Sequence, residues 1–103
     1  MKVIYVDDDE DLRDIVDFAL SAHGGFDLQC TADAASALAL AERWQPDIVL
    51  SDVHMAGMDG MALLAALRSN PATADIPVIF LTATTDPKKR AGMLALGARA
   101  IID

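Results

Sequence analysis

Three short apolar runs of the chain are each followed closely by side chains that could do chemistry. These side chains are the carboxylates and the hydroxyl of Asp7, Asp8, Asp52 and Thr82. Carboxylates brought together are unfavourable unless a cation neutralises them. Hard oxygen ligands of this kind select Mg²⁺, which prefers a couple of carboxylates, a few waters and often a phosphate oxygen. The set therefore suits transfer of a phosphoryl group to a carboxylate.

The residue types predict a role for each member of this set. Asp52 is the nucleophile that accepts the phosphoryl group, and it also belongs to the metal site. Asp7 and Asp8 hold the metal, and Thr82 donates its hydroxyl to a phosphoryl oxygen. Ala83 is small enough to admit the phosphodonor.

These roles need a fold that brings the ends of the apolar runs together. Short apolar runs alternate here with longer segments of helical period, which is typical of strand–helix units around a parallel sheet. The predicted strands are 3–6, 26–30, 48–50, 78–81 and 100–102. The predicted helices begin near 12, 33, 60 and 86 and end at Gly24-Gly25, Arg43, Asn70-Pro71 and Gly97.

This element order predicts an α/β fold, a flavodoxin-like doubly wound parallel sheet of five strands in the order 2-1-3-4-5. The run at 26–30 alternates between apolar and polar residues, so we expect it at an edge. The first helix should bury one apolar face and leave acids in water; that face is Leu12, Ile15, Val16, Ala19 and Leu20. Ligands of such sheets bind where the strand order reverses, here between the first and third strands.

Composition limits the class of protein. With 103 residues, 53% of them hydrophobic, the chain suits one compact domain. A net charge of −8 argues against direct nucleic-acid binding. We expect no membrane span and no signal peptide, and a cytoplasmic location. Cys30 is the only cysteine, and we expect it to be a small buried apolar residue.

Other acids near the first strand have simpler interpretations. Asp9, Glu10 and Asp11 suit the start of a helix, where negative charge is favoured. A calcium loop from Asp7 is excluded, because Leu12 occupies the position that requires glycine.

Four segments resemble those of one known family. They are "VIYVDD" at 3–8, "PDIVLSDVHMAGMDG" at 46–60, "IPVIFLTATTD" at 76–86 and "ALGARAIID" at 95–103. Their order and spacing resemble the receiver domain of bacterial two-component response regulators. The resemblance covers essentially residues 1–103, which we expect to form one receiver domain.

The resemblance implies phosphorylation-dependent signalling. A sensor histidine kinase or phosphotransfer protein would phosphorylate Asp52, and an output domain or downstream protein would respond. The domain would assist its own phosphorylation and dephosphorylation without being an enzyme in the usual sense. It also implies a Mg²⁺ contact from the backbone carbonyl of His54. The side chains of His54 and Thr84 are expected at the rim of the site, and a homodimer is a further hypothesis.

The chain departs from the family pattern at three places. Ala56 stands where the family usually has proline, and Ile101 occupies the switch position on the fifth strand that is usually aromatic. The family's lysine and fifth helix would follow Asp103, so we expect a C-terminally incomplete receiver.

Two alternatives remain open. One is a protein-binding module that keeps the receiver fold without depending on phosphorylation, which Ile101 and the missing lysine would favour. The other is a Mg²⁺-dependent aspartyl-phosphate phosphatase of the haloacid dehalogenase type. That family expects a nucleophile on the first strand, a second acid two residues later, and then threonine or valine. Asp7 and Asp9 would be the two acids, but Asp11 follows them.

Overall fold

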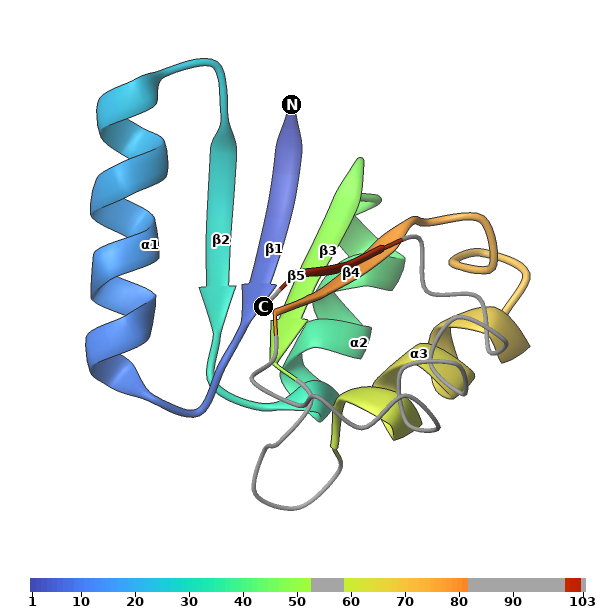
Figure 1. The fold of residues 1–103 in the computed structure, drawn as a ribbon. Coiled ribbons are helices and arrows are strands. Elements are labelled where there is room, and N and C mark those ends of the chain that lie inside the picture. The colour runs from blue at the N-terminus through green and yellow to red at the C-terminus, as the bar shows by residue number, and fades with distance from the viewer. Residues whose placement is uncertain (53–58, 82–99, 103) are drawn as a thin grey trace.

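The computed structural model describes residues 1–52, 59–81 and 100–102, and its strands form one parallel sheet (Figure 1). The elements in chain order are β1 (Lys2–Val6), α1 (Glu10–His23), β2 (Asp27–Thr31), α2 (Ala34–Trp44), β3 (Ile48–Asp52), α3 (Gly60–Ser69), β4 (Val78–Leu81) and β5 (Ala100–Ile102). The strand order is β2-β1-β3-β4-β5, and every pairing is parallel. The predicted fold, its strand order and the edge position of β2 are confirmed.

The boundaries of the elements agree closely with the sequence patterns. β4 and β5 have the predicted bounds, and the other strands and the first three helices differ by one or two residues at their ends. The fourth predicted helix, which ends at Gly97, lies outside the described residues. Among the helices that are described, none is long and apolar enough to cross a membrane.

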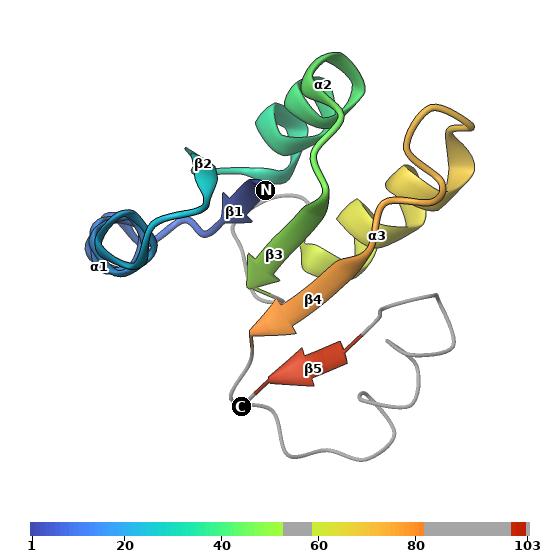
Figure 2. The same cartoon turned by 90° about the horizontal axis from the view of Figure 1, so that it is seen from above.

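The hydrophobic core lies between the sheet and the two helices α2 and α3 (Figure 2). Side chains alternate between the faces of a strand, and the residues of β1, β3 and β4 that face these helices are fully buried. The core is made by Ile4, Val6, Ala34, Ala37, Ala41, Val49, Leu63, Leu64, Leu67, Ile76, Val78 and Phe80. This face therefore supplies most of the apolar burial that stabilises the described part of the fold.

Helix α1 lies on the opposite face of the sheet, beside β2 (Figure 2). The prediction of a buried apolar face on this helix was wrong, because no residue of α1 is buried. Of the predicted face, Leu12 and Ile15 are 42% and 62% exposed, and Val16 and Leu20 are half-buried. Phe18, which was not part of that face, is 78% exposed. The physical reason is its position: α1 packs against an edge strand, and the described residues place no second helix beside it.

Each described helix begins at an aspartate whose side chain accepts backbone N–H groups. Asp9 accepts from the amides of Asp11 and Leu12 at 2.9 and 3.3 Å, as predicted for a helix cap. Asp33 and Asp59 do the same for α2 and α3. The hydrogen bond from the Ser36 amide lowers the pKa of Asp33. At the other end of α1, Gly24 has φ +80°, a conformation that side chains disfavour, which explains the predicted stop.

The difference between the two faces predicts a difference between two substitutions. We expect Leu64→Ala to lower the free energy of unfolding by about 2–5 kcal/mol, because it leaves a cavity in the core. Phe18→Ala removes a larger side chain that is 78% exposed, and we expect a change within about 0.5 kcal/mol. Urea denaturation followed by circular dichroism measures both. Similar losses in the two variants would contradict the location of the core.

Candidate functional site

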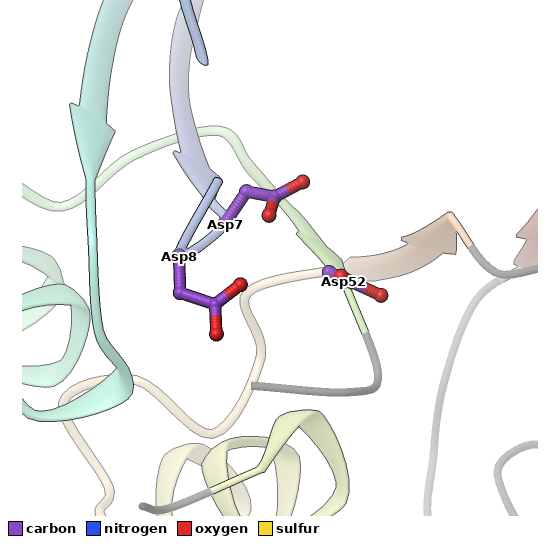
Figure 3. Close-up of side chains that lie close together, drawn as sticks. All are labelled: Asp7, Asp8 and Asp52. Atoms are coloured by element: carbon purple, nitrogen blue, oxygen red, sulfur yellow. The ribbon is translucent and has the colours of Figure 1, made fainter. Parts of the chain in front are cut away.

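Three carboxylates meet at the carboxyl ends of β1 and β3 (Figure 3). Val6 of β1 lies opposite Ser51 of β3, so the next residues along the two strands, Asp7 and Asp52, emerge side by side. Asp8 follows directly, and one carboxylate oxygen from each of the three residues lies within 4.8 Å of the others. This is the point between β1 and β3 where the strand order reverses, at which ligands bind in such sheets.

The position of Asp7 is fixed by hydrogen bonds to its side chain and to its main chain. It is 2% exposed, and both of its carboxylate oxygens accept hydrogen bonds. Oδ2 accepts from the Tyr5 hydroxyl at 2.6 Å, and Oδ1 accepts from the Asp9 amide at 3.0 Å. The main chain of Asp7 is also held, because its amide donates to the Thr31 carbonyl at 3.1 Å and its carbonyl accepts from Arg13 Nη1 at 2.8 Å.

The other two carboxylates are more accessible to solvent. Asp8 is exposed and Asp52, the last residue of β3, is half-buried. The Asp52 carbonyl accepts a hydrogen bond from the hydroxyl of the fully buried Ser51 at 2.8 Å. One side of the cluster therefore lies in the protein and the other opens to water, so that a small ion and a phosphodonor could reach it.

The donor set fits Mg²⁺. Mg–O distances are about 2.0–2.1 Å, so oxygens on opposite sides of the ion lie about 4.2 Å apart. Oxygens that already lie within 4.8 Å of one another need only small side-chain movements to reach that geometry. A set of three carboxylates matches the preference of Mg²⁺ for few protein ligands. Asp7, Asp8 and Asp52 are thus the described residues that could hold the ion.

The sequence interpretation missed Tyr5 and Arg13. Tyr5 was counted as one more apolar residue of the first strand, yet it is two residues before Asp7 and so faces the same side of the strand. Burial raises the pKa of Tyr5, and the hydrogen bond to Asp7 and the Asp7 charge raise it further. The hydroxyl therefore remains protonated and acts as a donor. The two-residue spacing from Asp7 was the signal that could have identified it.

The remaining predicted site residues are not brought into this cluster by the described part of the chain. Ile101 lies in β5, where its backbone is opposite Phe80. The other four lie outside the described residues; they are His54, Thr82, Ala83 and Thr84. Their roles stay predictions.

Cys30 is separate from the carboxylate cluster, and the expectation that it is buried was wrong. The residue is exposed, because it lies on the edge strand β2, and its thiol donates to the Arg13 carbonyl at 4.0 Å. Partial burial and then the charge of Asp17 raise the pKa of Cys30. The thiolate is thus disfavoured, and Cys30 is a poor candidate for a nucleophile.

A parallel sheet in this strand order, with aspartates at its switch point, is typical of the class of signalling domains that accept a phosphoryl group. The family model of the response regulator receiver domain matches residues 3–103. The chain belongs to this family.

Known proteins and structures agree with this assignment. The chain is 37% identical over 82 residues to the DNA-binding dual master transcriptional regulator RpaA of Synechocystis sp., covering 80% of this chain and 34% of RpaA. The chain thus spans about a third of the length of that relative. It is also 37% identical over 97 residues to a 14.6 kDa protein from the sodA1 3′ region of Leptolyngbya boryana, covering 94% of this chain and 73% of that protein.

Solved structures match over nearly the whole chain. Chemotaxis protein CheY4 of Vibrio cholerae superposes with a TM-score of 0.91 at 33% identity, covering 98% of this chain and 83% of CheY4. The BeF3-activated N-terminal receiver domain of Klebsiella pneumoniae RstA superposes with a TM-score of 0.88 at 27% identity, covering 99% and 84% of the two chains. The fold is therefore that of a receiver domain.

The proximity of like charges predicts that the intact cluster destabilises the metal-free protein. We expect Asp52→Asn to raise the free energy of unfolding by about 1 kcal/mol in a chelating buffer, because unit charges about 4–5 Å apart in a water-like medium repel by that amount. Mg²⁺ should reduce or reverse this difference in the free energy of unfolding between variant and native chain, because the ion stabilises the folded state that binds it. Denaturation curves with chelator and with Mg²⁺ measure both effects. A variant less stable than the native chain in chelator would contradict net repulsion.

Proposed function

We propose that the chain is a phosphorylation-dependent receiver in which Asp52 accepts a phosphoryl group from a histidine kinase or phosphotransfer protein in a Mg²⁺-dependent reaction. The observation that carries this proposal is the meeting of Asp7, Asp8 and Asp52 at the switch point of the sheet. Membership of the receiver family supports it. Asp52 ends β3 and is half-buried, and it stands at the position where the family resemblance places the acceptor.

The transfer is a displacement at phosphorus. An Asp52 carboxylate oxygen forms a bond to the phosphorus of a phosphohistidine, and the bond from phosphorus to the histidine nitrogen breaks. The nitrogen keeps the electron pair and the imidazole is released. When bound, Mg²⁺ offsets the charge of the carboxylates and of the phosphoryl oxygens. Asp7 and Asp8 would hold it together with Asp52.

The proposal gives roles to residues beyond the described part of the site. The backbone carbonyl of His54 would complete the protein ligands of the ion. The hydroxyl of Thr82 would donate to a phosphoryl oxygen, and Ala83 would leave room for the donor. The side chains of His54 and Thr84 would line the rim, and Ile101 would occupy the switch position. Hydrolysis of the acyl phosphate by the same site would return Asp52 to its starting state.

The response to phosphorylation would pass to a partner. A phosphoryl group stabilises one of two arrangements only as far as it interacts with them differently. RpaA is named as a DNA-binding regulator, whereas this chain carries a net charge of −8, which opposes direct contact with nucleic acid. We therefore propose that a separate output domain or downstream protein responds, and that a homodimer is one form of the response. Because the proposed phosphodonors act in the cytoplasm, the proposal includes that location.

Intact-mass spectrometry after incubation with acetyl phosphate and Mg²⁺ tests the proposal. We expect one phosphoryl group on the native chain and none on Asp52→Ala, because only that carboxylate is the acceptor. Asp75→Ala is the matched control, since Asp75 is an exposed aspartate between α3 and β4, and it should be labelled like the native chain. A chelator should prevent labelling.

Other outcomes of this test would favour the alternatives. Labelling of Asp52→Ala to the native extent would contradict the assignment of the acceptor. Continuous turnover of a phosphomonoester, in place of stoichiometric labelling, would favour a phosphatase. An unlabelled native chain that still binds its partner would favour a binding module that does not depend on phosphorylation.

A further inference from the structure

The hydrogen bond between Tyr5 and Asp7 connects the buried interior of the sheet to the carboxylate cluster. We propose that Tyr5 is a positioning residue that fixes the direction of the Asp7 carboxylate and thereby strengthens metal binding. This inference rests on the proposed function, because it concerns the ion that Asp7, Asp8 and Asp52 would share.

The Tyr5 ring is buried in the sheet, which restricts the position of its hydroxyl. Tyr5 is 3% exposed and lies in β1, with Cys30 of β2 opposite it on one side and Leu50 of β3 on the other. A tyrosine side chain has only two rotatable bonds, and a buried ring has little freedom to change either of them. The hydroxyl therefore stays where it donates to Asp7 Oδ2 at 2.6 Å.

Asp7 is held by donors on both of its carboxylate oxygens. The Asp9 amide donates to Oδ1 at 3.0 Å while the Tyr5 hydroxyl donates to Oδ2, so rotation of the carboxylate would break both hydrogen bonds. Each oxygen accepts one such bond and keeps a second lone pair for an ion. Asp8, by contrast, is exposed. Asp7 is therefore held rigidly, at the end of a strand that is buried on both faces.

Loss of the Tyr5 hydroxyl could act in two opposite directions. It would free the carboxylate to rotate, which weakens binding, but it would also remove a donor that competes with the ion for negative charge. Loss of hydrogen bonds that orient metal ligands typically costs 10–100-fold in metal affinity. Asp7 keeps the hydrogen bond from the Asp9 amide when the Tyr5 hydroxyl is absent. We therefore expect the affinity for Mg²⁺ to fall about tenfold, near the lower end of this range.

The substitution Tyr5→Phe tests this inference. It removes the hydroxyl and keeps the ring, so that packing changes little. We expect the Kd for Mg²⁺, from amide chemical shifts during a titration, to rise about tenfold. Val3→Ala is the matched control, because Val3 is 2% exposed and lies on the same face of the same strand. It should lower the thermal stability and leave the Kd unchanged in the folded protein.

A second measurement separates positioning from a general loss of structure. At subsaturating Mg²⁺ the rate of Asp52 phosphorylation by acetyl phosphate should be lower in Tyr5→Phe than in the native chain. At saturating Mg²⁺ the two rates should converge, because the substitution acts through occupancy of the site. A rate that stays low at saturation, or an unchanged or tighter Kd, would overturn the inference.

The chain has a single tyrosine, so fluorotyrosine incorporated during expression labels Tyr5 alone. Its fluorine resonance should shift during the Mg²⁺ titration with the same Kd as the amides near Asp52. The shift should be absent in Asp8→Asn. A fluorine signal that ignores Mg²⁺ while the amides respond would overturn the inference and leave the proposed function standing. A native chain whose amides near the cluster do not respond to Mg²⁺ would overturn both.

Discussion

The pairing of β1 with β3 is the constraint on which the site depends. These strands are neighbours in space although β2 lies between them in sequence, and their register places Val6 opposite Ser51. Side chains on a strand alternate with a period of two. A slip of one residue in this pairing would send Asp52 to the face that holds the core, and Asp7 would lose its neighbour. Specific pairing of β1 with β3 thus determines the chemistry at their ends.

The core stabilises an arrangement of charges that is unfavourable by itself. Buried residues of β1, β3 and β4 pack against α2 and α3 on one face of the sheet, and the interactions of this face hold the strand ends in place. Hydrogen bonds from Tyr5 and the Asp9 amide compensate for part of the burial of the Asp7 carboxylate, as a buried charge requires. The remaining repulsion is what makes the cluster receptive to a cation.

Much of the fold was predictable because the sequence expresses it locally. Continuous apolar runs indicated strands buried on both faces; this holds for β1, whereas β3 and β4 are buried on the core face and half-buried on the other. The mixed pattern at 26–30 identified the edge. Aspartate caps and a double glycine marked the helix ends. The convergence of Asp7, Asp8 and Asp52 followed from the strand order, because parallel strands bring their carboxyl ends to one edge of the sheet.

Other features could not be predicted, for physical reasons. Periodicity tells which residues of α1 share a face, but coverage of that face depends on what packs against it, and here Leu12 and Ile15 remain exposed. Cys30 has an apolar side chain of a size that suits a core, yet an edge strand leaves it exposed. A tyrosine in an apolar run suggests packing. Its two-residue spacing from Asp7 indicates a shared face of the strand, but whether the hydroxyl reaches the carboxylate depends on side-chain torsions that the sequence does not specify. The roles assigned to residues in 53–58 and 82–99 stay predictions, because these segments lie outside the described residues.

The hydrogen bond from Arg13 to Asp7 links two parts of the protein that differ greatly in burial. The Arg13 guanidinium, from α1, donates to the main-chain carbonyl of Asp7, and α1 itself has no buried residue. A helix with so little burial is expected to open locally at a lower free energy than the core strands. A ligand that immobilises Asp7 on binding would then disfavour this local opening. A protein that binds α1 and keeps it closed would in turn raise the affinity for that ligand by the same factor. The exposed helix is thereby thermodynamically coupled to the buried end of β1.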